Sequence, residues 1–180
     1  MNRKESIRRG FSLMELLLVI FIISLVYFLG FSGVEKREEK EVSLTPLTLK
    51  KTIMRSSLFH GEGTLLCINE CDSCYFRNNI ASAFEPYEGK LGLSGLKSYR
   101  VSADESLQQL EYGRYQDNRI CLLFHIYPNG SSTQLILKTK DGTYFLPAYF
   151  GEPQKTESLE AARDLWLEHS QDLSSQGDFY

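Results

Sequence analysis

Residues 9–31 read RGFSLMELLLVIFIISLVYFLGF, and this stretch organises the interpretation of the whole chain. From residue 11 to residue 31 the run is apolar except for one acidic residue, Glu15. A helix of this length extends roughly 32 Å at about 1.5 Å per residue, enough for a hydrocarbon core of about 30 Å. The stretch therefore predicts a membrane-spanning helix near the start of the protein.

The charge around this run predicts its orientation. Four basic residues against Glu5 give residues 1–10 a net charge of +3: Arg3, Lys4, Arg8 and Arg9. Basic residues stay on the cytoplasmic side of a membrane helix, so the rest of the chain should cross. The whole chain carries −3, so the part after residue 10 carries −3 − 3 = −6. This acidity disfavours direct nucleic acid binding by that part.

Glu15 needs a partner, because a carboxylate near the middle of a membrane helix costs on the order of 3 kcal/mol. A cut after Gly10 would create an α-amino group at Phe11, about one helical turn from Glu15. That amine and the positive end of the helix dipole are natural counter-charges for Glu15.

The sequence Arg9-Gly10-Phe11-Ser12-Leu13-Met14-Glu15 resembles the cleavage and methylation site of type IV prepilins and pseudopilins. The resemblance implies that a prepilin peptidase cuts after Gly10 and methylates Phe11. It also implies that Glu15 pairs with the N-terminus of a neighbouring subunit during filament assembly. Arg8-Arg9 also fits a twin-arginine signal, and Gly30-Phe31-Ser32 is a passable secretory cleavage site, but Glu15 fits neither export signal.

The rest of the chain predicts an α+β head. The expected divisions are a removed leader (1–10), the apolar helix (11–31), a charged stalk (32–46), the head (47–155) and a C-terminal helix with tail (156–180). An amphipathic helix is expected over 47–59, with Leu47, Ile53, Met54 and Leu58 on one side. Another is expected over 158–171, with a stripe of Leu159, Ala162, Trp166 and Leu173. It should dock on its own sheet, and docking on a neighbouring subunit is the alternative.

Strand patterns dominate the head. Strands are expected over 64–68, 75–77 and 97–102, and then over 120–127, 133–139 and 143–149. Asn129-Gly130 and Asp141-Gly142 separate the last three, and both dipeptides are strong antiparallel turn signals. These three strands therefore predict a meander.

The segment Phe124-His125-Ile126-Tyr127-Pro128-Asn129-Gly130-Ser131-Ser132, followed by Leu135-Ile136-Leu137, resembles the strand-turn of H-type minor pseudopilins of type II secretion systems. This resemblance implies a long hydrophobic N-terminal helix followed by a pilin-like antiparallel β-sheet head. It implies a single-pass protein of the bacterial inner membrane, with a cytoplasmic N-terminus and a periplasmic head. The expected partners are other pseudopilin subunits, the prepilin peptidase, the inner-membrane assembly platform and the membrane. A competence DNA-uptake system or a type IV pilus is the open alternative.

Four cysteines form the other notable cluster: Cys67, Cys71, Cys74 and Cys121. An even number in an exported domain favours disulfides, although a four-cysteine zinc site or redox-active thiols stay open. Those alternatives would make the chain a membrane-anchored periplasmic redox or metal-binding protein. Four cysteines allow three pairings. Cys67–Cys74 is preferred because each residue lies at the end of a hairpin strand, leaving Cys71 to reach Cys121.

No enzyme is expected, and no cofactor or metal. The chain shows neither a nucleophile elbow nor a glycine-rich phosphate loop. His125 is expected on the same alternating strand face as Cys121, Leu123 and Tyr127, in a structural role. His60 follows the first helix of the head, and His169 lies in the C-terminal helix.

Overall fold

A computed structural model of the protein describes residues 13–32 and 43–175. The chain divides into two compact units, Met1–Lys40 and Glu41–Tyr180, which are described separately. The cleavage-site residues Gly10 and Phe11 lie outside the described residues.

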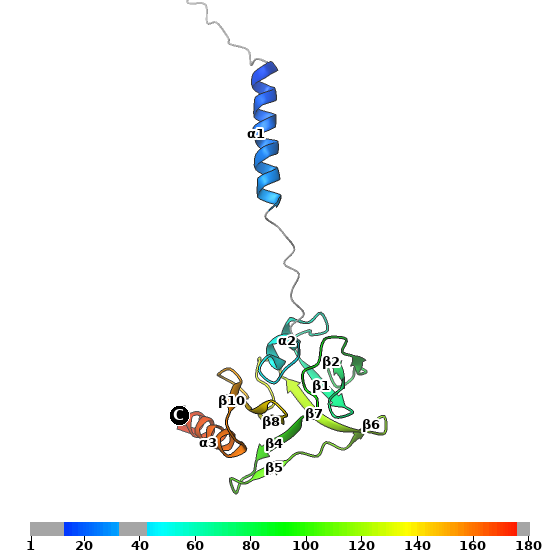
Figure 1. Cartoon of the computed structure of the whole chain (residues 1–180), viewed down its shortest axis with the longest axis vertical. Coiled ribbons are helices and arrows are strands. Elements are labelled where there is room, and N and C mark those ends of the chain that lie inside the picture. The colour runs from blue at the N-terminus through cyan, green and yellow to red at the C-terminus, as the bar shows by residue number, and fades with distance from the viewer. Residues whose placement is uncertain (1–12, 33–42, 176–180) are drawn as a thin grey trace, which may run out of the picture. The chain divides into compact units, whose positions relative to one another are not determined.

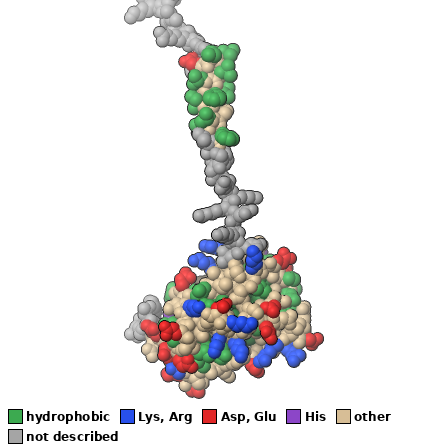
Figure 2. All heavy atoms as spheres, viewed as in Figure 1, with side chains coloured by type: hydrophobic (Ala, Val, Ile, Leu, Met, Phe, Trp, Pro, Cys, Tyr) green, Lys and Arg blue, Asp and Glu red, His purple; other side chains and the backbone are tan. Residues whose placement is uncertain are grey.

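In the first unit, the described part is one helix, α1 (Leu13–Ser32). Its sequence is almost wholly apolar, and Glu15 lies in its first turn, where a carboxylate interacts favourably with the helix dipole. The large apolar side chains from Leu13 to Phe28 are exposed, as Figure 2 also shows. By criteria of length and hydropathy, no helix in the described part of the chain qualifies as a membrane span.

In the second unit, the described residues form a short helix, two antiparallel five-stranded sheets and a C-terminal helix (Figure 1). The first sheet has the order β3-β2-β1-β7-β6: β1 (Gly63–Ile68), β2 (Ser73–Arg77), β3 (Glu85–Pro86), β6 (Arg114–Tyr115) and β7 (Asn118–Ile126). The second sheet has the order β10-β9-β8-β4-β5: β4 (Lys97–Val101), β5 (Leu107–Gln109), β8 (Leu135–Thr139), β9 (Gly142–Leu146) and β10 (Gln154–Thr156). The α+β class predicted from the sequence is therefore confirmed for the head.

The main core draws apolar side chains from both sheets and from the start of the head. Its buried members are Leu44, Leu49, Ile53, Leu65, Cys67, Cys71, Cys74, Phe76, Leu93, Leu96, Leu122, Phe124, Ile126, Leu135, Leu137, Tyr144 and Leu146. Strand β1 is buried on both faces, because Leu66 and Ile68 point away from this core into a second cluster with Ile120. Burial on both faces explains why β1 reads as a continuous apolar run rather than an alternation.

The predicted three-strand meander is wrong, because the chain changes sheet after β7. Strand β7 pairs with β1 and β6, whereas β8 pairs with β9 and β4. The turn at Asn129-Gly130 forms, and the Asn129 Oδ1 accepts a hydrogen bond of 3.0 Å from the Ser131 amide. Beyond it, the Ser132 amide donates to the Ala148 carbonyl oxygen at 2.7 Å. The backbone pairing that follows the turn consists of the bridge between Ile126 and Ser132, the hydrogen bonds between His125 and Thr133, and the bond from the Tyr127 amide to the Ser131 carbonyl oxygen.

The helix predicted over 47–59 is shorter and presents a different face. Helix α2 (Leu49–Arg55) buries Leu49 and Ile53, which are four residues apart and lie on one side. Leu47 and Met54, placed on the buried side by the sequence pattern, are each 43 % exposed. The Ser56 amide donates to the Ile53 carbonyl oxygen at 3.0 Å and ends the helix there.

The C-terminal helix α3 (Leu159–Ser175) packs on the second sheet, as the sequence pattern predicted. Its start is capped by Ser158, whose Oγ accepts a 3.1 Å hydrogen bond from the Ala161 amide. Ala162 is fully buried against Ile136 and Phe145. The Trp166 ring lies 6.3 Å from the Phe145 ring between centroids.

Candidate functional site

The predicted assembly residue Glu15 lies in the first turn of α1. A negatively charged side chain in the first turn of a helix interacts favourably with the helix dipole. The residues predicted to be processed, Gly10 and Phe11, lie outside the described residues, so the pairing of Glu15 with an N-terminal amine stays a prediction.

The four cysteines form two disulfides, Cys67–Cys74 and Cys71–Cys121. These are the pairs that the sequence favoured. Cys67 and Cys74 face each other in the register of β1 and β2, with Cα atoms 4.1 Å apart. All four sulfurs are joined in pairs. Because zinc binds thiolates rather than disulfide sulfurs, this arrangement favours the disulfide interpretation over the zinc one.

A β-bulge positions Cys121 for its partner. Cys67 pairs with Leu122 and Ile68 pairs with Ile120, so Cys121 is the extra residue on β7. The bulge turns Cys121 toward the main core, while Leu123 contacts the second cluster. The prediction that Cys121 and Leu123 lie on the same face of the strand is therefore wrong. A bulge re-aims one side chain by breaking the alternation of a strand, and residue spacing alone does not reveal it.

The turn between β1 and β2 has three consecutive residues in the left-handed region. The φ angles of Asn69, Glu70 and Cys71 are 53°, 55° and 68°. The Asp72 amide donates to the Asn69 carbonyl oxygen at 3.0 Å, and the Gly95 amide donates to the Glu70 carbonyl oxygen at 2.8 Å. Each left-handed residue other than glycine costs on the order of 1–2 kcal/mol, so the disulfides and these hydrogen bonds hold a turn that is unfavourable in isolation.

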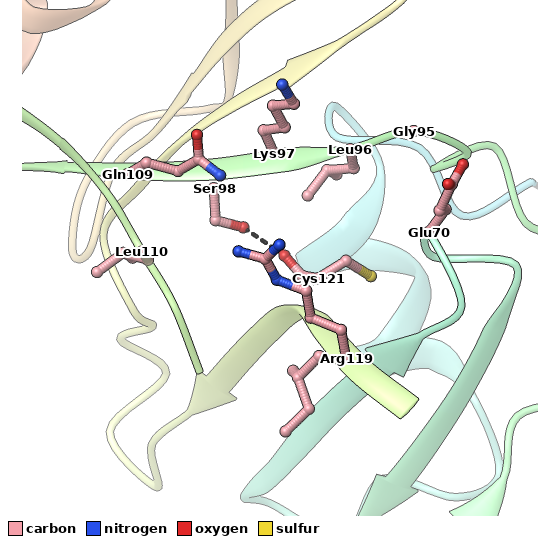
Figure 3. Close-up of a pocket in the computed structure, with 10 residues that line it drawn as sticks. Glu70, Gly95, Leu96, Lys97, Ser98, Gln109, Leu110, Arg119 and Cys121 are labelled. Carbon is pink, nitrogen blue, oxygen red and sulfur yellow. Dashed lines mark hydrogen bonds between the residues drawn. The ribbon is translucent and has the colours of Figure 1, made fainter. Parts of the chain in front are cut away.

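A cavity of about 410 Å³ adjoins this turn (Figure 3). Its walls come from β4, β5, β7 and the segments around Glu70 and Gly95. Figure 3 shows the Arg119 side chain extending toward Ser98, whose hydroxyl donates to the Cys121 carbonyl oxygen at 2.9 Å. The Arg119 Nη2 also forms an exposed ion pair of 2.6 Å with the Glu111 Oε1. Sequence patterns did not indicate this cavity, because its walls come from segments far apart in the chain.

Charged and polar side chains line the cavity, but the contacts of its lining serine are not those of an activated nucleophile. The one lining hydroxyl, that of Ser98, donates to a carbonyl oxygen, and no histidine lies among the lining residues. A serine nucleophile needs an adjacent base to take its proton.

The three histidines have structural contacts. The His125 Nδ1 lies 2.8 Å from the Thr64 Oγ1, and the His125 ring lies 4.4 Å from the Tyr127 ring. The His169 ring lies 5.2 Å from the Phe145 ring, and the His60 Nδ1 lies 3.2 Å from the Leu58 carbonyl oxygen. Among the described residues, no group of three His, Cys, Asp or Glu side chains is arranged to hold a metal ion.

Comparison with known proteins identifies no relative of this chain. No family model matches the chain, and neither the curated proteins nor the solved structures yield a match.

Proposed function

We propose that this protein is a minor pseudopilin, a structural subunit of a periplasmic pseudopilus that drives protein export by type II secretion. One observation carries the proposal: an apolar helix with Glu15 in its first turn directly follows the Gly10-Phe11 junction and the basic leader. This order of leader, junction, acidic residue and apolar helix is the pattern that the prepilin resemblance rests on.

The surface of α1 supports an apolar environment for this helix. Its large apolar side chains from Leu13 to Phe28 are 43–76 % exposed. A contiguous apolar surface of this kind marks a region that contacts lipid or other proteins. In the proposed function, residues 11–31 cross the inner membrane before assembly and pack against the equivalent helices of neighbouring subunits afterwards.

The head supports the proposed compartment. Structural disulfides persist in oxidising compartments such as the bacterial periplasm and are rare in the cytosol. The Cys67–Cys74 and Cys71–Cys121 bonds therefore fit a head that has crossed the membrane. In this proposal the role of the protein is mechanical, and its partners are other pseudopilins, the prepilin peptidase and the inner-membrane assembly platform.

Mass spectrometry of the N-terminal peptide tests the proposal. In cells with an active prepilin peptidase, the mature chain should begin at Phe11 and carry one methyl group on its amine. Without the peptidase, the chain should keep residues 1–10. A mature chain that begins at Met1 or Gly33 in cells with the peptidase would overturn the proposal.

A gene deletion then distinguishes the secretion system from related filaments. We expect the deletion to abolish secretion of exported enzymes while DNA uptake and twitching continue. Loss of DNA uptake or of twitching in place of secretion would assign the subunit to a competence filament or a type IV pilus.

A further inference from the structure

The two disulfides interlace along the chain. In sequence order the cysteines are Cys67, Cys71, Cys74 and Cys121, and the first is bonded to the third and the second to the fourth. Pairing each cysteine with the next one along the chain would instead give Cys67–Cys71 and Cys74–Cys121. The native bonds therefore cannot form by joining neighbouring cysteines in order.

In the unfolded chain, loop length favours the wrong partners for Cys71. Cys67 and Cys74 each lie within four residues of it, whereas its native partner Cys121 lies 50 residues away. The probability of closing a flexible loop falls roughly as the −3/2 power of its length, so a 50-residue loop closes roughly 40-fold less often than a four-residue one. A chain that is oxidised before it folds should therefore bond Cys71 mainly to Cys67 or to Cys74.

Folding separates Cys71 from these two neighbours, and it needs distant segments to do so. Asn69, Glu70 and Cys71 are all in the left-handed region, which an unfolded chain rarely adopts at three consecutive residues other than glycine. The Gly95 amide holds this turn from outside the hairpin, through its 2.8 Å bond to the Glu70 carbonyl oxygen. Cys121 reaches the turn through its bulge, which depends on the pairing of β7 with β1. Until those contacts form, the hairpin does not direct Cys71 to Cys121.

A mispaired chain has no thiol with which to correct itself. Disulfides rearrange when a thiolate attacks one of their sulfurs, and two bonds among four cysteines leave no thiol free. In the folded head these residues are also shielded, since Cys67 and Cys71 are 0 % exposed and Cys74 is 3 % exposed. The attacking thiolate must therefore come from another molecule and act before the core closes.

We propose that the head, before it is fully folded, is a substrate of a thiol–disulfide isomerase, an enzyme with a reactive cysteine thiolate, in the compartment that receives it. This inference rests on the proposed function, which places the head in an oxidising compartment. A disulfide-bearing oxidase first takes two electrons and two protons from each pair of thiols, and its own disulfide is reduced to two thiols. The isomerase then rearranges the bonds without net oxidation.

Three exchanges convert the mispaired chain into the native one. The isomerase thiolate attacks Cys71 in the Cys67–Cys71 bond, forms a mixed disulfide with Cys71 and releases the Cys67 thiolate. That thiolate attacks Cys74 in the Cys74–Cys121 bond, forms Cys67–Cys74 and releases the Cys121 thiolate. Cys121 then attacks Cys71 in the mixed disulfide, forms Cys71–Cys121 and returns the isomerase thiolate. Each exchange breaks one S–S bond and forms another, so the electrons balance.

Oxidative refolding of the purified full chain tests the inference. The chain is reduced and denatured in urea with detergent and is oxidised by a disulfide-bearing oxidase during dilution. It is then incubated with or without a bacterial periplasmic disulfide isomerase. Non-reducing peptide mapping identifies the pairs, because cleavage after Glu70 and Asp72 places the three hairpin cysteines on separate peptides. Native pairs should be present in a minority of chains without the isomerase and should rise several-fold with it.

Two double variants are the matched controls. Cys67→Ala/Cys74→Ala leaves only Cys71 and Cys121, and Cys71→Ala/Cys121→Ala leaves only Cys67 and Cys74. Two cysteines have a single possible bond, so it should form to the same extent with and without the isomerase, even in a variant that folds poorly. A requirement for the isomerase in either variant would mean that the enzyme assists folding without rearranging bonds, and it would overturn the inference.

The same peptide map of the protein from cells, with thiols blocked at lysis, separates this inference from the proposed function. Cells without the isomerase should accumulate mispaired chains, and cells with it should contain the native pairs. Four free thiols in both kinds of cell would contradict the proposed export of the head. Native pairs in most purified chains without the isomerase would overturn the inference and leave the proposed function standing.

Discussion

The Ser98 hydroxyl donates a 2.9 Å hydrogen bond to the Cys121 carbonyl oxygen and thereby joins β4 of the second sheet to β7 of the first. Ser98 is 2 % exposed, so the bond forms away from bulk water. Cys121 is at the same time the bulged residue of β7 and the disulfide partner of Cys71. One residue thus connects the first sheet to the hairpin turn and to the second sheet.

Replacing Ser98 with alanine tests this connection. Ser98→Ala should lower the free energy of unfolding by about 1 kcal/mol, because the Cys121 carbonyl oxygen loses a donor in a buried position. The measurement is urea denaturation of the exported protein. Ser57→Ala, at an exposed position, is the control and should stay within about 0.5 kcal/mol of the original protein. Equal effects of the two substitutions would show that the bond contributes nothing specific.

The two disulfides should contribute different amounts to the free energy of unfolding of the head. Their sequence separations are 7 residues for Cys67–Cys74 and 50 for Cys71–Cys121. The chain-entropy model gives about 2.5 kcal/mol for the shorter loop and about 4 kcal/mol for the longer one. Cys71→Ala/Cys121→Ala should therefore destabilise the head more than Cys67→Ala/Cys74→Ala. Each double variant removes two sulfurs, so each serves as the control for the other in chemical denaturation. The reverse order would mean that the short bond acts mainly through the folded turn.

At position 70, a glycine variant should be more stable than an alanine variant, which is the reverse of the usual order of stability. Glu70 has a φ of 55°, a region that glycine adopts without a steric penalty from Cβ. We expect Glu70→Gly to be more stable than Glu70→Ala by roughly 1 kcal/mol, since both lose the same carboxylate and only alanine keeps the Cβ. Thermal unfolding of the two variants under identical conditions measures the difference. A more stable alanine variant would show that the left-handed turn is not retained in solution.

The β1–β2 hairpin and its Cys67–Cys74 disulfide could be predicted because their determinants are local, and Cys71–Cys121 then followed as the remaining pair. Cys67 and Cys74 lie on adjacent strands of one hairpin, so their proximity follows from the strand pattern and a short turn. The hairpin of β8 and β9 was likewise indicated by Asp141-Gly142, and Gly142 has a positive φ of 151°. The alternation of buried residues along a strand and the residue types of a turn both depend on neighbouring positions, so a single sequence reveals them.

The sheet change and the bulge could not be predicted because they depend on distant segments. A strand-turn-strand pattern does not state whether the second strand pairs with the first or with another sheet. Here β8 pairs with β4, whose residues lie more than thirty positions earlier in the chain. The bulge at Cys121 similarly depends on its pairing with β1, and the cavity depends on both arrangements. Gly10 and Phe11 lie outside the described residues, so their predicted processing awaits the N-terminal measurement.

Glu15 provides the test that separates membrane insertion from assembly. Glu15→Val should insert into the membrane at least as well as the original chain, because the charge in the first turn of the apolar helix is removed, at a gain of up to about 3 kcal/mol. Assembly should nevertheless fail, because the amine of a neighbouring Phe11 would lose its carboxylate partner in a low-dielectric setting. Glu15→Gln is nearly the same size as the original side chain and should fail in the same way, which assigns the effect to charge. Ile20→Val, a change within the apolar run, should assemble normally. The readouts are the membrane fraction of the subunit and its recovery in sheared or cross-linked filaments. Normal incorporation of both Glu15 variants would refute the pairing between Glu15 and the neighbouring N-terminus.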